Sequence, residues 1–434
     1  MILLLACTEP AVTPPVPDDT SDTSPPFLSP ADALDLDPEA DVFHVKLTAG
    51  LDGDGYAYDG QVPGPTMRAK VGDAVQVDFT NALDAPTTVH WHGMAVPNEM
   101  DGVAWLADPV QPGESFTYTF VADRAGTFWY HPHVDVDHQV EHGLYGVFVV
   151  EEDDAPADDL VIVWHGMLPD DHDDDDHDDD DHEDGGHDHT AGDPAAIAWT
   201  ANGMALPDAA IPAGTRVRML NASNTAYLDL AWPGMRQIGS DQGLLSALAE
   251  PTSVLLAPGD RADFEWAGDA TIATARYTAS GGAALGPSIP LMNVTEAPGT
   301  APAWAFPGGQ PSADPAYADL VYVFSGGTDG TWLINGEAYP DVTVSTLPLG
   351  ADAILEIRNL SSSEHPFHVH GHRFEVLSVD GVPPAAPTVE DTVNVGIGQR
   401  VRLRLSATNP GDWMLHCHLL GHEEGGMMTV LRVE

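Results

Sequence analysis

The chain has 434 residues, 43% of them hydrophobic, which is enough for about two to four domains with ordinary cores. Asp and Glu number 68 against 15 Lys and Arg, and the net charge of −53 excludes nucleic acid and disfavours anionic membrane surfaces as partners. The sequence has no run of about 18 or more apolar residues, so we expect no membrane-spanning helix. The 42 glycines and 37 prolines indicate many turns between short strands, which favours an all-β fold.

The first residues, 1–7, form a short apolar segment that ends in Leu-Leu-Ala-Cys. This ending resembles the lipobox at which bacterial lipoproteins are cleaved and lipidated, which makes Cys7 a candidate lipid anchor. The segment is shorter than a usual signal core and carries no Lys or Arg, so it would be a truncated leader. The alternative is a disordered tail with a stray cysteine. Residues 8–39 are rich in Pro, Thr and Asp, and we expect a disordered tether.

One pattern occurs three times along the rest of the chain. Each copy contains an alternating strand that ends in an asparagine, namely Asn81, Asn221 or Asn359. A turn followed by a proline precedes each strand, and a glycine turn with a second alternating strand follows it. Short alternating runs between such turns are typical of β-sandwiches, so we expect three sandwich domains in tandem. Their predicted bounds are 40–153, 158–298 and 299–434.

An acidic insertion, residues 170–189, lies early in the second domain and contains 12 Asp, one Glu and five His. Its histidines are spaced for neither a helix nor a strand, and we expect a disordered surface loop. It is either a solvated run of charge or an accessory loop that collects metal ions. Its candidate ligands are His172, His177, His182, His187 and His189.

Ten of the 20 histidines lie in four tight clusters, two in the first domain and two in the third. The second domain has no histidine at the equivalent places, so the sequence predicts a metal site shared by domains one and three, with domain two as a spacer. Side chains alternate across a strand, so both rings of each His-x-His pair reach one face. The ten are His90, His92, His131, His133, His365, His368, His370, His416, His418 and His422.

The last cluster contains the sequence His416-Cys417-His418. On a strand the thiol points to one face and the two imidazoles to the other, so the backbone would link a metal bound by sulfur to metals bound by the histidines. Two histidines, a thiolate and a weak axial methionine form the blue-copper ligand set. The candidates are His365, Cys417, His422 and Met427, with Met428 as the alternative axial ligand. Ligation of copper by Cys417 would leave no disulfide to Cys7.

These four clusters resemble the copper motifs of the multicopper oxidases, a laccase-like family of tandem cupredoxin domains. The similarity covers about residues 40–434, and all four motifs are complete. The resemblance implies three tandem cupredoxin-like Greek-key β-sandwich domains with four copper ions: one type 1, one type 2 and a type 3 pair. It implies His90 and His368 as type 2 ligands. It implies as type 3 ligands His92, His131, His133, His370, His416 and His418.

Two acidic residues stand where this family has acidic residues beside its copper motifs. Asp101 follows the first motif, and Glu423 follows the last blue-copper histidine. The resemblance implies that both help to deliver protons, together with Cys417 as the route for electrons. The alternative is that Asp101 and Glu423 are ordinary solvated carboxylates.

The resemblance further implies a copper-dependent oxidoreductase that takes single electrons at the type 1 copper, near the surface at the edges of His365 and His422, and reduces dioxygen to water at a buried cluster. Three hypotheses remain for the electron donor. A laccase-type enzyme would oxidise phenols or aromatic amines in an open apolar groove beside His422. A metallo-oxidase would oxidise cuprous, ferrous or manganous ion for metal tolerance, and a copper-binding protein would have no turnover. We expect a monomer outside the cytoplasm, lipid-anchored in the envelope or periplasm, or secreted.

Overall fold

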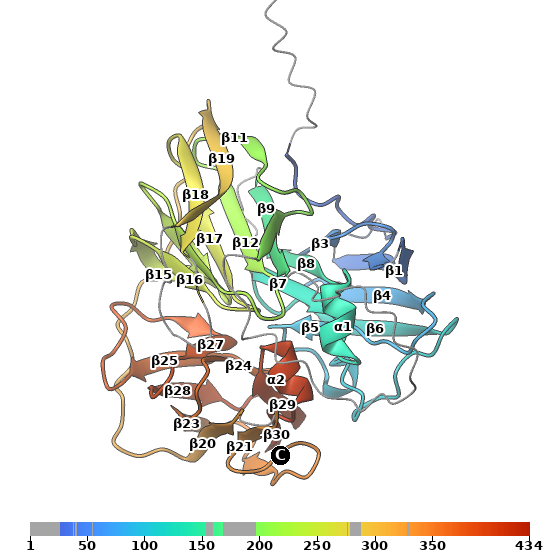
Figure 1. The fold of residues 1–434 in the computed structure, drawn as a ribbon, viewed down its shortest axis with the longest axis vertical. Helices are drawn as coiled ribbons and strands as arrows, with labels where there is room; N and C mark the ends of the chain where they lie inside the picture. Colours follow the sequence, from blue (N-terminus) through green and yellow to red (C-terminus); the bar gives the residue numbers. More distant parts are fainter. Residues whose placement is uncertain are drawn as a thin grey trace, which may run out of the picture.

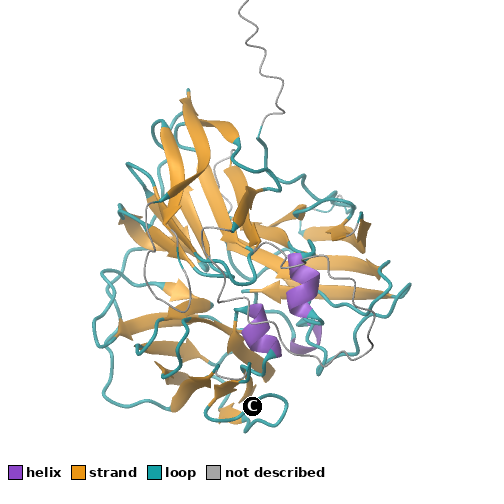
Figure 2. Ribbon diagram, in the orientation of Figure 1, coloured by secondary structure: helices purple, strands orange, loops and turns teal. Residues whose placement is uncertain are grey.

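The computed structural model describes residues 27–434 except 38, 40, 54, 153–158, 168–196, 276, 278–287 and 328–329. The predicted leader with Cys7, most of the predicted tether and the whole acidic loop 170–189 lie outside these residues. The described chain is almost entirely β-strand, arranged in three successive pairs of sheets (Figures 1 and 2). This confirms the all-β class with three tandem cupredoxin-like sandwiches. Neither of the α-helices in the described ranges has the length and apolarity needed to cross a membrane.

The first pair of sheets contains eight strands: β1 (Val42–Asp52), β2 (Gly55–Tyr58), β3 (Gly64–Lys70), β4 (Ala74–Asn81), β5 (His90–His92), β6 (Ser115–Val121), β7 (Gly126–His131) and β8 (Gly146–Glu151). Their orders are β2-β1-β4-β6 and β3-β8-β7-β5. The strands form because apolar residues alternate: Val75, Val77 and Phe79 of β4 are buried in the core between the sheets, while the residues between them are partly exposed. The sheet that contains β5 and β7 carries the first two histidine clusters.

The second pair of sheets contains eleven strands: β9 (Asp159–Met167), β10 (Ala198–Ala201), β11 (Asp208–Pro212), β12 (Arg216–Asn221), β13 (Leu228–Ala231), β14 (Gln237–Ser240), β15 (Gly243–Ala249), β16 (Val254–Leu256), β17 (Arg261–Glu265), β18 (Ala270–Ala275) and β19 (Ile289–Ala297). The sheet orders are β10-β9-β12-β17-β14-β15 and β11-β19-β18-β13-β16. The core between them includes Trp164, Met219 and Phe264.

The third pair of sheets also contains eleven strands: β20 (Leu320–Gly326), β21 (Trp332–Ile334), β22 (Ser345–Leu347), β23 (Asp352–Asn359), β24 (His365–Val369), β25 (Phe374–Val379), β26 (Val389–Glu390), β27 (Thr392–Val395), β28 (Arg400–Ser406), β29 (Gly411–Cys417) and β30 (Met428–Val433). The orders are β21-β20-β23-β28-β25-β26 and β22-β30-β29-β24-β27. Adjacent β24 and β29 carry His365, His368 and His416, and the other three histidines of the third and fourth clusters follow shortly after these strands.

The repeated asparagines Asn81, Asn221 and Asn359 have the same structural role in all three domains. Each is fully buried, and its side-chain amide donates to two backbone carbonyls, one of them four or five residues further on. Its side-chain oxygen accepts the backbone N–H two residues ahead. These bonds satisfy buried backbone groups of the loop that follows the strand. In the first and third domains this loop leads to a histidine cluster.

The three domains pack closely against one another. A separate apolar cluster joins Trp129 of β7, Val161 and Val163 of β9, and Leu420, so it contains residues of all three domains. Leu420 opens the short helix α2 (Leu420–Glu424), which lies beside α1 (Val136–Glu141) near the middle of Figure 1. A 3₁₀ turn, η1 (Asn98–Met100), follows the first histidine cluster. The histidine clusters therefore lie where the domains meet.

Candidate metal centre

Strands of two domains bring the histidine clusters together. In the first domain, β5 pairs with β7 so that His90 lies opposite His131. In the third domain, β24 pairs with β29 so that His368 lies opposite His416. The register of each strand pair thus places two sequence clusters side by side, as the repeat pattern predicts.

The rings from the two domains contact one another directly. His90 stacks on His370 with ring centroids 3.9 Å apart, and His92 stacks on His368 at 3.6 Å. The Nε2 atoms of His370 and His416 are 3.0 Å apart. Eight buried histidines make up this group, which we call the histidine cluster: His90, His92, His131, His133, His368, His370, His416 and His418.

Hydrogen bonds to backbone carbonyls hold the outer ring nitrogens of His90 and His131. Nδ1 of His90 donates to the carbonyl of Asp101 (2.9 Å), and Nδ1 of His131 donates to the carbonyl of Pro132 (2.8 Å). Because a carbonyl only accepts, these bonds fix the tautomer and leave the Nε2 lone pair of each ring free. Both Nε2 atoms are buried without a hydrogen-bond partner among the described residues. Such orphaned atoms are rare in folded proteins unless a ligand binds them, and they fit a metal site.

The spacing and protonation of the rings also fit a metal. Burial lowers the pKa of six of these histidines, that of His368 to about 4, so these six rings are neutral near pH 7 and offer lone pairs; the others are His92, His131, His133, His370 and His418. Buried imidazoles suit copper, among other transition metals. Candidate ligand atoms lie within 4.8 Å of one another in three overlapping groups: His90, His368 and His370; His90, His92 and His131; His133, His370 and His416.

A second candidate site lies within the third domain. Sγ of Cys417 lies 3.3 Å from Nδ1 of His365 and 3.7 Å from Nδ1 of His422, and the two Nδ1 atoms are 3.2 Å apart. Burial raises the pKa of the Cys417 thiol, so a bound cation is needed to favour the thiolate. Met427 is fully buried in the same core, and its carbonyl accepts the N–H of Cys417. Its role as axial ligand stays a prediction. We call this set the Cys417 site.

The outer edge of the Cys417 site is covered. The sequence predicts that the edges of His365 and His422 lie near the surface, but both rings are buried. The half-buried Ser361 places its hydroxyl 2.6 Å from Nε2 of His365. The indole of Trp332 stacks on the ring of His422 with centroids 3.8 Å apart. Ser361 therefore covers part of the His365 ring, and Trp332 covers one face of the His422 ring.

Both predicted acidic residues lie beside the histidine cluster. Oδ2 of Asp101 accepts a hydrogen bond of 2.8 Å from Nδ1 of His370. The carboxylate of Glu423 lies 3.2 Å from Nδ1 of His133 and 2.9 Å from Nδ1 of His416. Both carboxylates are buried, so the solvated alternative is wrong for each. Delivery of protons by these residues stays a prediction.

The sequence reading missed a third acidic residue, Asp391. Oδ1 of Asp391 and Oγ1 of Thr392 each lie 3.1 Å from Nε2 of His92. Nδ1 of His368 donates to the carbonyl of Asp391 (3.0 Å) and lies 3.1 Å from Oγ1 of Thr392. The contact follows from the pairing of β24 with β27, which places Thr392 opposite His368. No sequence spacing gives this register, because β24 and β27 are not consecutive: β25 and β26 lie between them in the chain.

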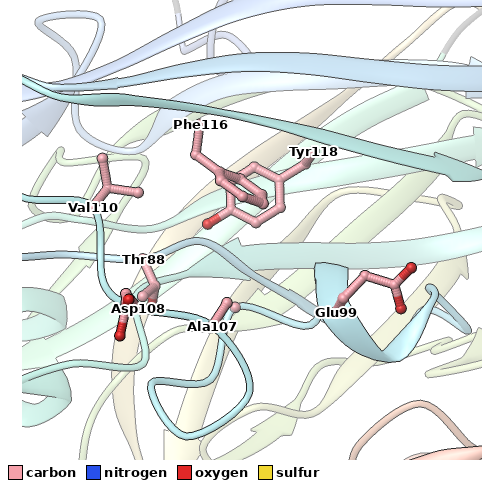
Figure 3. Close-up of a pocket in the computed structure, with 8 residues that line it drawn as sticks. Thr88, Glu99, Ala107, Asp108, Val110, Phe116 and Tyr118 are labelled. Atoms are coloured by element: carbon pink, nitrogen blue, oxygen red, sulfur yellow. The ribbon is translucent and has the colours of Figure 1, made fainter.

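The first domain contains a small pocket, whose lining residues are drawn in Figure 3. Its wall includes Thr88, whose hydroxyl accepts the backbone N–H of His133, and Gly102, which follows Asp101. Two further carboxylates, Glu99 and Asp108, also line it. Polar groups therefore extend from the pocket to the carboxylate that holds His370.

The middle domain adds no ligand to either site within the described residues. Its described histidine, His165, is buried and stacks on Tyr145 with ring centroids 5.1 Å apart. Nδ1 of His165 donates to the carbonyl of Ala222. His165 is thus a buried core residue held by a hydrogen bond.

Comparison with known proteins gives a consistent result. Two family profiles, both described as "Multicopper oxidase", match residues 42–155 and 312–434. The multicopper oxidase MmcO of Mycobacterium tuberculosis is 33% identical over 419 residues, which cover 86% of this chain and 82% of that protein. Laccase-1 of Fomitopsis schrenkii is 26% identical over 478 residues, with 91% and 86% covered. A multicopper oxidase structure from Pseudomonas thermotolerans superposes with a TM-score of 0.74, at 29% identity, over 91% of this chain and 100% of that one.

Tandem cupredoxin-like sandwiches that bury a cysteine with two histidines beside a cluster of eight imidazoles define a copper-dependent oxidoreductase. The chain belongs to the multicopper oxidase family. Copper is thus the metal that the family implies, and the donor set fits it.

Proposed function

We propose that this chain holds four copper ions and couples the one-electron oxidation of a donor to the four-electron reduction of dioxygen to water. The proposal assigns the type 1 copper to His365, Cys417, His422 and Met427, the type 2 copper to His90 and His368, and the type 3 pair to the other six members of the histidine cluster. Its main support is that the Nε2 atoms of His90, His131 and His368, on rings from two domains, are buried and have no hydrogen-bond partner among the described residues. Bound copper would supply the one-electron redox chemistry.

The protein's own contribution begins with the residues around Cys417. The backbone of β29 joins Cys417 covalently to His416 and His418, so a short bonded path connects the two candidate sites. The pairing of β24 with β29 places Phe367 opposite Cys417 and His368 opposite His416, which fixes both sites on one rigid sheet. This arrangement favours electron transfer without a moving part.

Two carboxylates orient the rings and stand in position to hold protons. Asp101 accepts from His370, and Glu423 lies against His133 and His416. Outer carboxylates of this kind fix the tautomer and strengthen the ligand. We assign both residues to proton delivery. We further propose that water in the pocket lined by Gly102, the residue after Asp101, is the source of these protons (Figure 3).

For the electron donor we propose two candidates. A metal ion is favoured by the net charge of −53, which attracts cations, and by the covered edges of His365 and His422, which leave little contact for a large aromatic ring. A phenol or aromatic amine is favoured by the likeness to laccases. A solved relative of the same fold from Campylobacter jejuni is described as a metallo-oxidase, at 24% identity and a TM-score of 0.76, covering 94% of both chains.

Oxygen uptake separates the two donors. The copper-loaded protein is given a methoxyphenol or cuprous ion held by a weak chelator, with residues 170–189 present or deleted. Faster uptake with cuprous ion that falls on deletion supports the metallo-oxidase and the accessory role of the loop histidines. Rapid uptake with the phenol that survives the deletion supports the laccase, and no uptake with either donor refutes the proposed oxidase.

We also propose that the protein acts outside the cytoplasm, anchored by a lipid on Cys7. The support is the Leu-Leu-Ala-Cys ending of the first seven residues. Expressed in a bacterial host behind a complete lipoprotein leader, the chain should partition with membranes, and Cys7→Ser should release it. Equal release of both proteins into the soluble fraction would contradict the anchor.

A further inference from the structure

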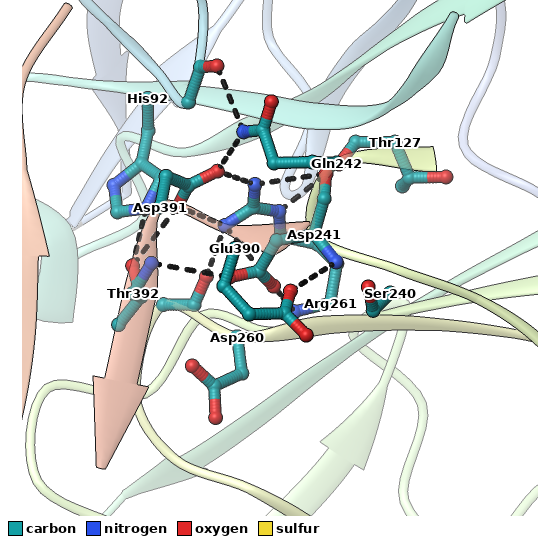
Figure 4. A network of polar contacts seen from close by, with 12 residues as sticks. His92, Thr127, Ser240, Asp241, Gln242, Asp260, Arg261, Glu390, Asp391 and Thr392 are labelled. Carbon is teal, nitrogen blue, oxygen red and sulfur yellow. Dashed lines mark hydrogen bonds and ion pairs between the residues drawn. The ribbon is translucent and has the colours of Figure 1, made fainter. Parts of the chain in front are cut away.

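The middle domain contacts the histidine cluster although it supplies none of its rings. In the turn before β17, Gly259 packs directly on His418: a Cβ at this glycine would lie 3.1 Å from Cγ of the ring, and its φ of +91° also favours glycine. Two residues later, Arg261 enters the space between the three domains (Figure 4). The sequence-based expectation that this domain is only a spacer is therefore wrong, because its β17 end forms part of the wall around the rings.

All five N–H donors of the Arg261 guanidinium are used. The side chain is fully buried, and a guanidinium offers five donors in a fixed planar fork. Its partners come from all three domains, so a single side chain joins them. They are the carbonyls of Thr127 (3.0 Å), Gly259 (2.8 Å) and Asp241 (3.2 Å), and both carboxylate oxygens of Asp391, with Oδ1 at 2.9 Å.

Asp391 connects Arg261 to the histidine cluster, because its carboxylate contacts both Arg261 and His92. Arg261 binds both oxygens of Asp391, and Gln242 donates a further hydrogen bond to Oδ2 (Figure 4). Two-point binding fixes the plane of the carboxylate. Its Oδ1 then lies 3.1 Å from Nε2 of His92, which directs the opposite nitrogen, Nδ1, inward; this Nδ1 is buried and has no hydrogen-bond partner among the described residues.

The glycine after the first histidine motif shows how tightly the pair is packed. A Cβ at Gly93 would lie 2.5 Å from Oδ2 of Asp391 and 2.7 Å from a terminal nitrogen of Arg261. The carbonyl of Gly93 accepts hydrogen bonds from Arg124 and Gln242. The arginine–carboxylate pair therefore occupies the space in which a side chain would otherwise lie, next to His92.

We propose that Arg261 of the middle domain is a positioning residue of the copper cluster: it holds Asp391, and Asp391 orients His92 and His368. This rests on the proposed copper ligation by these two histidines. Loss of a residue that orients a metal ligand weakens metal binding by about 10- to 100-fold. The middle domain thus sets the affinity of the type 2 and type 3 coppers and leaves the Cys417 site unchanged.

The test compares Arg261→Lys with Arg216→Lys. Lysine keeps the charge of Arg261 but cannot hold both oxygens of Asp391 in one plane. Arg216 is a matched control, because it is equally buried, pairs with Asp263 and Glu152, and contacts no histidine of the cluster. Each variant is dialysed against a graded copper buffer, and copper per chain, blue absorption and the electron paramagnetic resonance spectrum are recorded.

For Arg261→Lys we expect the type 2 resonance and cluster copper to require about 10- to 100-fold more free copper, with the blue absorption unchanged. Arg216→Lys should leave both unchanged. Asp391→Asn should reproduce the defect, and the double variant Arg261→Lys/Asp391→Asn should be no worse than Asp391→Asn alone. If Arg261→Lys fails to fold, Gln242→Ala, which removes one bond to Asp391, should show the same selective loss in smaller degree.

Two results overturn the proposal. Native copper affinity and a native type 2 resonance in Arg261→Lys, or in Gln242→Ala where the first variant fails to fold, show that the arginine does not act on the ligands. Equal loss of the type 1 and type 2 signals shows a merely structural role. A wild-type protein that never displays a type 2 resonance instead refutes the proposed copper assignment, so the two failures are distinguishable.

Discussion

The Cys417 site and the histidine cluster differ in how many parts of the chain build them. The residues proposed for the Cys417 site all come from the third domain, between His365 and Met427. Rings of the histidine cluster come from two domains, and the carboxylate behind His92 is held by an arginine of the remaining one. A site within one sandwich depends on the register of its strands, whereas a shared site depends also on how the domains pack.

The two sites should therefore respond differently to substitution, and Cys417→Ser gives the largest expected effect. The hydroxyl is a poor copper ligand, so the blue absorption should vanish and one copper per chain should be lost. Oxygen uptake with any donor should fall below about 1% of the native rate, since the path into β29 is removed. The type 2 resonance should remain. Retention of half the native uptake would show that electrons enter elsewhere.

Asp101→Asn should affect the histidine cluster alone. The amide keeps the shape of the side chain but removes the negative charge beside His370 and the site at which a proton could be held. We expect oxygen uptake to fall by about 10- to 100-fold and its pH profile to change, with native blue absorption. A matched control is Asp78→Asn, whose carboxylate pairs with His44 and has no described contact with a ring of the histidine cluster. An equal effect of both variants would contradict a specific role for Asp101.

Ser361→Ala should affect only the Cys417 site, and to a smaller extent. The change removes the hydroxyl 2.6 Å from Nε2 of His365 and uncovers the edge of that ring. For a phenol donor we expect kcat/KM to rise by about 2- to 5-fold. This corresponds to about 0.4 to 1 kcal/mol of improved contact between the donor and the ring, since about 1.4 kcal/mol is worth tenfold. For cuprous ion it should stay within twofold, and the type 2 resonance should not change. A fall in phenol oxidation would show that the hydroxyl binds the donor.

His165→Gln should leave activity at neutral pH unchanged, because His165 belongs to neither site. Burial lowers the pKa of His165 from 6.5 to about 4. The unfolded chain therefore binds a proton that the folded chain does not, so this residue's stabilisation is present above pH 6.5 and is lost as the pH falls toward 4. The loss is up to about 3 kcal/mol at 1.36 kcal/mol per unit. Thermal unfolding of metal-free protein at pH 7 and pH 4.5 should show a smaller acid shift in the variant.

Much of this contrast could be predicted from the sequence. Three copies of a turn and strand pattern predict three sandwiches, and the pattern ends in Asn81, Asn221 or Asn359. It recurs because each asparagine makes equivalent hydrogen bonds to the loop that follows its strand. Spacing within a strand predicts which rings share a face, because alternation is a local property. The same reasoning predicts the separation of Cys417 from His416 and His418.

Contacts between domains could not be predicted in this way. Arg261 and Asp391 are 130 residues apart in the sequence, and His92 and Asp391 are 299 apart. The sequence around Arg261 does not distinguish its role from that of Arg216. Arg216 is as deeply buried, but it pairs with a different carboxylate. The difference arises only where the three domains meet. Likewise, the cover over His365 and His422 depends on how Ser361 and Trp332 fold back on the rings.

We propose that one chain of this protein holds both a blue copper and a separate copper cluster. Copper content and the electron paramagnetic resonance spectrum of the fully loaded protein test it most directly. The account predicts about four copper ions per chain, with distinct type 1 and type 2 signals and a further pair that is silent because its spins are coupled. A fully loaded protein with about one copper per chain and no type 2 signal would contradict it.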